Sequence, residues 1–144
     1  MSAVIQSEGH ELSELELRAK IVAFENVLKT MPQIDIPVEH FFAPGVYVRQ
    51  IRISKGTWMT GSIYKEASVH TVLKGKMAVV TDRGMKTVEA PCTFVSPPNV
   101  KRAGYAYEDT IWQAAFPNPD NETDPDKIMA KMTTEVFAIE GSTQ

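Results

Sequence analysis

The N-terminal part of the chain has the pattern of an amphipathic helix. Ser13 followed by Glu16 is a capping box, in which each side chain accepts a hydrogen bond from the other residue's backbone N–H, so a helix should begin there. Apolar residues then recur at spacings of three and four up to about Thr30, and Pro32 prevents continuation. This stripe consists of Leu17, Ile21, Phe24 and Leu28, with Val27 beside them. It covers either the chain's own sheet, the usual role of such a helix, or a second copy in a homodimer.

Between residues 37 and 116 the pattern changes to short β-type runs separated by turn residues. The segment 82–84 (Asp-Arg-Gly) predicts a hairpin connection. We expect the aromatic residues Tyr47, Trp58 and Trp112, which lie in these runs, to be part of the core. The candidate strands are residues 46–53, 57–64, 69–73, 76–81, 85–89, 93–96, 100–107 and 110–116. Short strands with regular turns indicate a sandwich or barrel and not a parallel α/β sheet.

A second helix is predicted near the end of the chain. Asp124 can cap its N-terminus, with Pro125 at the first helical position. Its apolar stripe consists of Ile128, Met132 and Val136. We therefore divide the chain into an N-terminal helical extension (1–36), a barrel (37–117) and a loop with a C-terminal helix (118–144).

Composition narrows the class of protein. The 144 residues suit one domain, and 43% hydrophobic with 23% charged residues is ordinary for a globular protein. The net charge of −3 argues against a nucleic-acid partner. Cys92 is the only cysteine, so neither an intrachain disulfide nor a cysteine zinc site can form. The start lacks a basic n-region, and no apolar run approaches about 18 residues, so we expect no membrane partner and a cytoplasmic location.

Glycines and polar residues occur at a regular spacing in the middle of the chain. Gly56 is followed after five residues by residues 62–64 (Ser-Ile-Tyr), after three more by Ser68, and after six more by Gly75. This spacing resembles the first motif of the cupin superfamily, which reads Gly, five residues, His-x-His, three or four residues, Glu, six residues and Gly. Gly75 would permit the tight reversal at the end of that motif.

A second stretch matches the other cupin motif in spacing. Pro91 is followed after five residues by residues 97–99 (Pro-Pro-Asn), after two more by Arg102, and after three more by Ala106. The cupin motif reads Gly, five residues, Pro-x-Gly, two residues, His, three residues and Asn, and Asn can replace the turn Gly because it tolerates the left-handed conformation. The resemblance spans residues 45–116. It implies an all-β fold: a single cupin-type double-stranded β-helix (jelly-roll) barrel, here with an N-terminal and a C-terminal α-helix.

The residues at the positions that hold the metal in cupins differ from those of the superfamily. Two His, one Glu and a third His are replaced here by Ser62, Tyr64, Ser68 and Arg102. Hydroxyl groups are poor ligands unless deprotonated, and a guanidinium repels a cation. We therefore expect no metal and no other cofactor, and the metal-dependent reactions of cupins are not implied.

A different kind of site follows from strand alternation, because residues two apart point to the same side. If the inward face of the superfamily is kept, the mouth of the barrel holds Arg102, Tyr64, His70, Ser62 and Ser68. One fixed cation among hydroxyls and an imidazole suits a small anionic or polyhydroxy ligand, such as a nucleotide, sugar or carboxylate. The alternative is that Arg102 pairs with an internal carboxylate and that His70 is a satisfied core residue.

These observations favour a binding protein over an enzyme. A metal-independent isomerase or epimerase would use Tyr64 and His70 as an acid/base pair, but no carboxylate occupies the inward motif positions to tune a base. Residues 93–98 and 101–112 also resemble small cupin-type proteins of bacteriophages. That resemblance implies a phage accessory protein acting in the host cytoplasm, or a virion-structural or host-protein interaction module.

Overall fold

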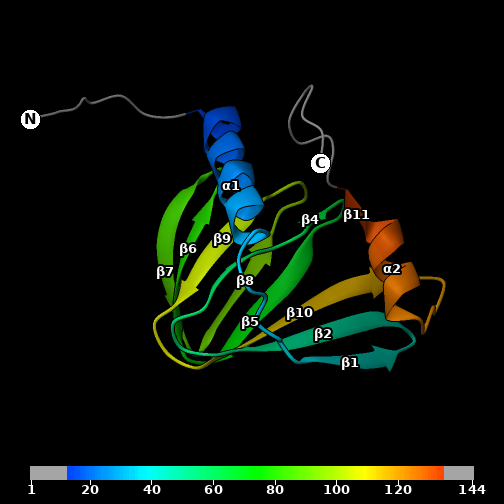
Figure 1. Cartoon of the computed structure of the whole chain (residues 1–144). Helices are drawn as coiled ribbons and strands as arrows, with labels where there is room; N and C mark the ends of the chain where they lie inside the picture. Colours follow the sequence, from blue (N-terminus) through cyan, green and yellow to red (C-terminus); the bar gives the residue numbers. More distant parts are fainter. Residues whose placement is uncertain (1–12, 135–144) are drawn as a thin grey trace, which may run out of the picture.

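The computed structural model describes residues 13–134. Its helices and strands are α1 (Glu14–Leu28), β1 (Val38–Ala43), β2 (Gly45–Ile53), β3 (Trp58–Thr60), β4 (Ile63–Tyr64), β5 (Ser68–Lys74), β6 (Lys76–Thr81), β7 (Gly84–Glu89), β8 (Cys92–Ser96), β9 (Arg102–Ala106), β10 (Thr110–Asn118), α2 (Pro125–Met132) and β11 (Thr133–Thr134). Figure 1 shows the strands curling into a barrel, with α1 over one end and α2 beside β2 and β10. In this part of the chain, neither helix is long and apolar enough to cross a membrane.

The strands form two larger sheets and one short pair, and every pairing is antiparallel. One sheet has the order β1-β2-β10-β5-β8, the other has the order β3-β9-β6-β7, and β11 pairs with β4. Apart from the hairpins β1–β2 and β6–β7, neighbouring strands in these two sheets are distant in sequence, so long-range pairing holds the sheets together, as in a jelly roll. The predicted all-β barrel with a helix at each end is therefore confirmed.

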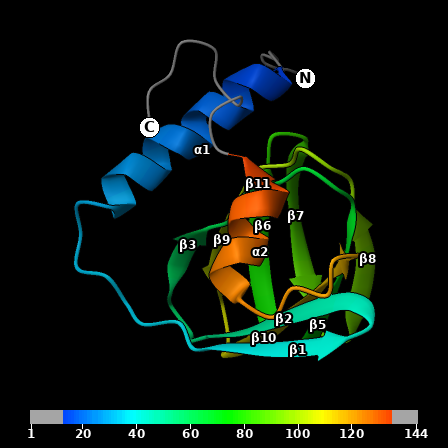
Figure 2. The same cartoon turned by 90° about the vertical axis from the view of Figure 1, so that its right-hand side faces the viewer.

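The helix α1 begins as its capping box predicts. The Ser13 Oγ accepts from the Glu16 N–H at 3.1 Å, and the Glu16 carboxylate accepts from the Ser13 N–H at 2.8 Å. The helix contacts β3, β6 and β9, so it covers its own chain, as Figure 2 also shows. Ile21 and Val22 are buried, whereas Val27 is 56% exposed.

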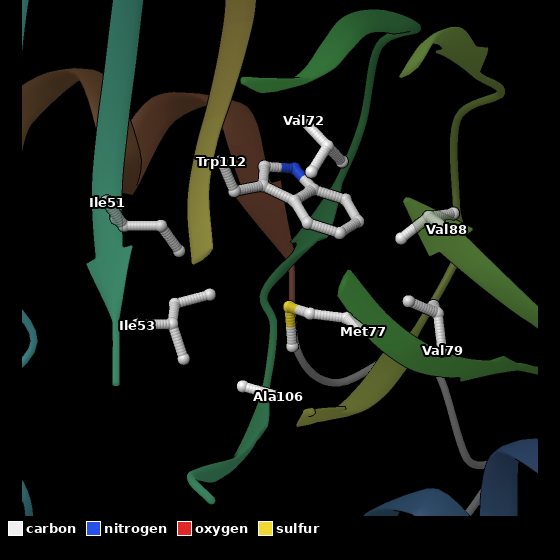
Figure 3. Packing of buried hydrophobic residues seen from close by; sticks show 8 residues of the cluster. All are labelled: Ile51, Ile53, Val72, Met77, Val79, Val88, Ala106 and Trp112. Atoms are coloured by element: carbon white, nitrogen blue, oxygen red, sulfur yellow. The ribbon is translucent and has the colours of Figure 1, made fainter. Parts of the chain in front are cut away.

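Two clusters of apolar side chains lie inside the barrel. In the larger cluster, Trp112 and Met77 point into the space between Ile51 and Ile53 of β2 and the valines of β6 and β7 (Figure 3). The smaller cluster contains Tyr47, Ala114 and Phe116 together with Ile128 of α2. Since these strand residues face inward, α2 closes one end of the barrel.

The prediction that Trp58 belongs to the core is wrong, whereas Tyr47 and Trp112 are buried as expected. Trp58 is 56% exposed. It pairs across the strands with Tyr105 and contacts Phe24 of α1 edge-to-face, with ring centroids 5.6 Å apart. The Trp58 ring is half-covered by α1 and is not enclosed by the barrel. Strand periodicity alone does not tell a residue inside the barrel from one that lies beneath a helix.

Several predicted boundaries also require correction. The expected strand 57–64 is interrupted at Gly61, whose N–H donates to the Arg102 carbonyl, and it forms β3 and β4. The strand β1 was not predicted, because its mostly exposed side chains give no alternating pattern. The helix α2 ends at Met132, where the chain turns into β11; Val136, predicted on its stripe, lies outside the described residues.

The turn residues adopt the conformations that the motif spacing predicts. Gly56, Gly75 and Asn99 have φ angles of 85°, 93° and 71°. Residues 82–83 form the tip of the β6–β7 hairpin, and Gly84 follows at φ 125°. At Gly75, a Cβ atom would also collide with the backbone of Asp109 and Thr110, so this turn requires glycine for two reasons.

We predict that Gly75→Ala destabilises the fold much more than Gly56→Ala does. Both glycines have similar positive φ angles, but open space surrounds Gly56. Gly56→Ala should therefore cost about 1–2 kcal/mol from backbone strain alone, and Gly75→Ala about 3 kcal/mol or more because overpacking adds to that strain. Urea unfolding of both variants measures the difference. Equal losses would contradict the close approach at Gly75.

Candidate functional site

A cavity of about 300 Å³ lies inside the barrel between the two larger sheets. Most of its wall is apolar and comes from β2, β6, β9 and β10, including Ile51, Ile53, Met77, Val79 and Trp112. Its polar lining residues are Arg49, Thr60, Ser62, Tyr64, His70 and Arg102. Four of the five predicted site residues therefore meet here, and no aspartate or glutamate is part of the lining.

Arg102, at the start of β9, is mostly buried. Its guanidinium donates to the Ser96 Oγ at 2.6 Å and lies 5.7 Å from the centre of the Phe94 ring. Burial lowers the pKa of Arg102, although the charges of Tyr64 and Asp82 oppose this shift. Among residues 13–134 it forms no ion pair with a carboxylate, so the expected alternative of an internal salt bridge is not observed.

The buried carboxylate of the barrel pairs with a different arginine. Asp82, at the tip of the β6–β7 hairpin, accepts a hydrogen bond from the Arg18 Nε of α1 at 2.7 Å. The same guanidinium donates to the Asn99 carbonyl. Both charged side chains are almost fully buried, so this pair fixes α1 to two loops of the barrel.

Arg49 is a second cation in the cavity and was not predicted from the sequence. It lies on β2 between the inward residues Tyr47 and Ile51 and is partly buried. Within the described chain, Arg49 makes neither a side-chain hydrogen bond nor an ion pair. The alternation along β2 was a usable signal, because an arginine at an inward position between apolar residues is unusual.

Tyr64 lies near both cations. Burial raises the pKa of its phenol, and the positive charges of Arg49 and Arg102 oppose that increase. The ring packs against Phe116, with centroids 4.6 Å apart. The hydroxyl therefore remains protonated at neutral pH and can donate a hydrogen bond into the cavity.

His70 is held between two partners on the floor of the cavity. Trp112 donates its indole N–H to the Nδ1 of His70 at 2.8 Å, which assigns the Nε2–H tautomer. The Nε2 lies 2.8 Å from the Ser68 Oγ and donates to it. Burial, with a smaller contribution from the Arg102 charge, lowers the pKa of His70 to about 3. His70 is therefore a satisfied, neutral core residue, as the alternative expectation stated.

The two predicted serines differ in position. Ser68 is buried against His70 and does not line the cavity, whereas Ser62 is exposed at its edge. Ser62 is exposed because it precedes β4 and lies outside a regular strand. Ser68 thus acts on the site only through the imidazole that it orients.

Helix α1 braces the edge of the cavity. Glu25 accepts hydrogen bonds from the Thr60 hydroxyl at 2.5 Å and from the Lys101 ammonium at 2.7 Å, and Lys101 also donates to the Gly61 carbonyl at 2.7 Å. Burial alone would raise the pKa of Glu25, but the hydrogen bonds from Lys101 and Thr60 outweigh it and lower that pKa. The segment 60–61 is therefore anchored to the helix.

The residue types around the cavity do not suit a metal ion. In the described part of the chain, no group of three or more His, Cys, Asp or Glu residues is arranged to hold one. His70 has both ring nitrogens engaged, and the neighbouring guanidinium groups repel cations.

Comparison with solved structures identifies the fold. No protein-family model and no curated protein matches the chain. A salicylate 1,2-dioxygenase from Pseudaminobacter salicylatoxidans matches with a TM-score of 0.56 and 16% identity over 81% of this chain and 36% of its own. An RmlC-like cupin protein from Methanocaldococcus jannaschii, with a double-stranded β-helix fold, matches with a TM-score of 0.50 and 18% identity over 60% of this chain and 84% of its own.

A conserved protein of unknown function from Streptococcus pyogenes gives a TM-score of 0.50 and 19% identity, over 61% of this chain and 78% of its own. At these identities the similarity shows the fold alone. The chain has the cupin fold, the double-stranded β-helix that its motif spacing predicts. None of the three structures is named as a phage protein, so the bacteriophage resemblance stays a prediction.

We predict that His70 makes stability depend on pH below its ordinary pKa. Because the folded-state pKa of about 3 lies below the ordinary 6.5, the neutral ring stabilises the native state fully above pH 6.5, and this contribution is lost as the pH falls toward 3. Between pH 7 and pH 5, His70 should account for a loss of about 2 kcal/mol in the free energy of unfolding.

Chemical unfolding of the native protein and His70→Gln at both pH values measures this contribution. Glutamine keeps a donor and an acceptor but does not titrate, so the variant should lose stability less steeply. Nitrogen chemical shifts of the imidazole provide a second readout, which should show the neutral Nε2–H form at pH 5. Identical pH dependences in the two proteins would contradict the assignment.

Proposed function

We propose that the barrel binds a small organic anion, a carboxylate or phosphate attached to an apolar body, without a metal. One observation carries this proposal. Two guanidinium groups, those of Arg49 and Arg102, line a largely apolar cavity in which the described residues supply no carboxylate partner.

The energetics of buried charge support an anionic ligand. Removing a cation from water is costly unless an opposite charge or several hydrogen bonds compensate. Arg102 has one side-chain hydrogen bond and one aromatic contact, which leaves most of its five N–H donors available. A carboxylate or phosphate accepts two parallel hydrogen bonds from a guanidinium, and this arrangement is among the strongest polar contacts in proteins.

The wall of the cavity favours an organic anion over a sugar. Polyhydroxy ligands require many hydrogen-bonding partners, whereas most of the lining is aliphatic, sulfur-containing or aromatic. A volume of about 300 Å³ is at the lower end for ligand pockets, which favours a small guest. Tyr64 supplies a neutral hydroxyl near the cations and would orient the anionic group, whereas the Thr60 hydroxyl already donates to Glu25.

The geometry argues against the isomerase alternative. An acid/base pair of Tyr64 and His70 needs an imidazole that accepts a proton near neutral pH. Both ring nitrogens of His70 are engaged, and its pKa is about 3. Binding is therefore the activity that the cavity supports best.

Thermal unfolding with benzoate, hexanoate and phenyl phosphate as probes tests the proposal, with benzyl alcohol as the neutral counterpart. At about 100 times its dissociation constant, a bound anion should stabilise the protein by about 2.7 kcal/mol, which raises Tm by roughly 5–10 °C. Arg49→Ala and Arg102→Ala should each abolish the increase, and Arg102→Lys should weaken it by loss of the planar fork.

Arg52→Ala is the matched control, because Arg52 is exposed and pairs only at 3.6 Å with Glu39 of β1. It should leave the anion-dependent increase unchanged. Ligand-free Arg102→Ala should lose only about 1–2 kcal/mol, from the Ser96 hydrogen bond and the Phe94 contact. A loss of about 3–5 kcal/mol without any probe-dependent shift would instead indicate a structural ion pair and overturn the proposal.

A separate prediction concerns the metal. Because Ser62, Tyr64, Ser68 and Arg102 stand at the positions of the cupin metal ligands, protein purified without a histidine tag should contain far less than one transition metal per chain by elemental analysis. A chelator should leave Tm and the anion-dependent shift unchanged. A stoichiometric metal whose removal lowers Tm would refute this expectation.

A further inference from the structure

The outer face of the five-stranded sheet carries a continuous row of apolar residues. The strand register aligns Phe41 of β1 with Val48 of β2, Val48 with Ala115 of β10, Ala115 with Val69 of β5, and Val69 with Val95 of β8. Their sequence neighbours Tyr47, Ala114, His70 and Ser96 are buried, so the row points away from the barrel. We call these five residues the outer row.

Three of the five residues of the outer row are exposed, and Val48 and Ala115 are half-buried. Val95 is 66% exposed, Phe41 48% and Val69 44%. An antiparallel sheet that faces water on one side normally carries polar residues there. Valine or phenylalanine on four of the five strands, with alanine on β10, is therefore unusual for a free surface.

The rows on either side contain little charge. On one side, Ala43 and Pro117 both pair with Val46. On the other side lies a polar row whose members satisfy one another: Gln50 donates to Glu39 at 3.0 Å, Gln113 donates to Gln50 at 2.8 Å, and the hydroxyls of Thr71 and Thr93 lie 3.3 Å apart. Glu39 is the one charged residue in these three rows, in a chain with 23% charged residues. Depletion of charge marks the core of a protein interface.

The two helices cover other surfaces. The helix α1 contacts β3, β6 and β9 of the four-stranded sheet (Figure 2). Ile128 of α2 packs on inward residues at one end of the barrel. Part of the apolar stripe of α1 is thus used within the chain, with Ile21 buried against the barrel.

We propose that the outer row is the interface through which two copies of this chain associate face to face. A patch that is apolar and nearly uncharged matches itself across a two-fold axis without placing like charges together. A strongly charged partner would find no complementary group on it.

The size of the face agrees with a weak dimer. Five strands about 4.8 Å apart and three rows of outward residues cover roughly 500 Å² on each subunit, or about 1,000 Å² in total. This area is near the lower limit for specific interfaces, so the dimer should dissociate on dilution. No helix or strand of the described chain covers the outer row. A second copy would bury these five side chains.

Sedimentation velocity over a series of protein concentrations tests the proposal, with the double variant Val69→Lys/Val95→Lys. The native chain should shift from monomer to dimer as its concentration rises, and the variant should remain a monomer, because two ammonium groups from each copy would be buried together. The matched control is Met85→Lys/Thr87→Lys, which places the same charges on exposed, outward positions of β7 in the other sheet. The control should dimerise like the native chain.

Circular dichroism and thermal unfolding of each variant verify folding. If the lysine variant does not fold, Val69→Thr/Val95→Thr keeps the β-branched shape and should weaken the dimer at least several-fold. A native chain that stays monomeric at the highest concentration, or a dimer that both outer-row variants leave unchanged, would overturn the proposal. Neither result depends on a ligand in the cavity. The dimer proposal and the anion-binding proposal can therefore be refuted independently of each other.

Discussion

The hydrogen bond from Trp112 to His70 fixes the tautomer of the imidazole in the barrel interior, and burial keeps that ring neutral. By occupying Nδ1, the indole holds the ring in one neutral tautomer and directs Nε2 toward Ser68. A protonated ring would place a third positive group beside Arg49 and Arg102, and the three would repel one another in a poorly solvated space. The interior tolerates its two guanidinium groups because the imidazole between the sheets stays uncharged.

The parts of the fold that the sequence could predict are those controlled by local backbone geometry. Gly56, Gly75 and Asn99 adopt positive φ angles that few other residues tolerate, so their spacing alone identified the turns of the barrel. The capping box at Ser13 is equally local and marked the start of α1 correctly. The arginine at the second motif followed from the same spacing, because a fixed turn determines where the next strand begins.

The remaining features depend on contacts between distant segments. Arg49 lies outside both motifs, and its place in the cavity depends on which face of β2 turns inward. Trp58 is half-exposed because a helix from far along the chain covers only part of its ring. The hydrogen bonds of Glu25 to Lys101 and Thr60 join three separate segments of the chain. No spacing pattern in the sequence could therefore predict them.

The protonation states around the cavity have a consequence for any molecule that enters it. Burial lowers the pKa of His70 to about 3 and raises the pKa of the Tyr64 phenol, so the imidazole stays neutral and the phenol stays protonated around neutral pH. The protein side of the site therefore keeps one charge state from about pH 4 to pH 9. An acidic ligand would bind as its conjugate base. The pH at which binding begins would therefore reflect the pKa of the ligand and not that of a residue in the cavity.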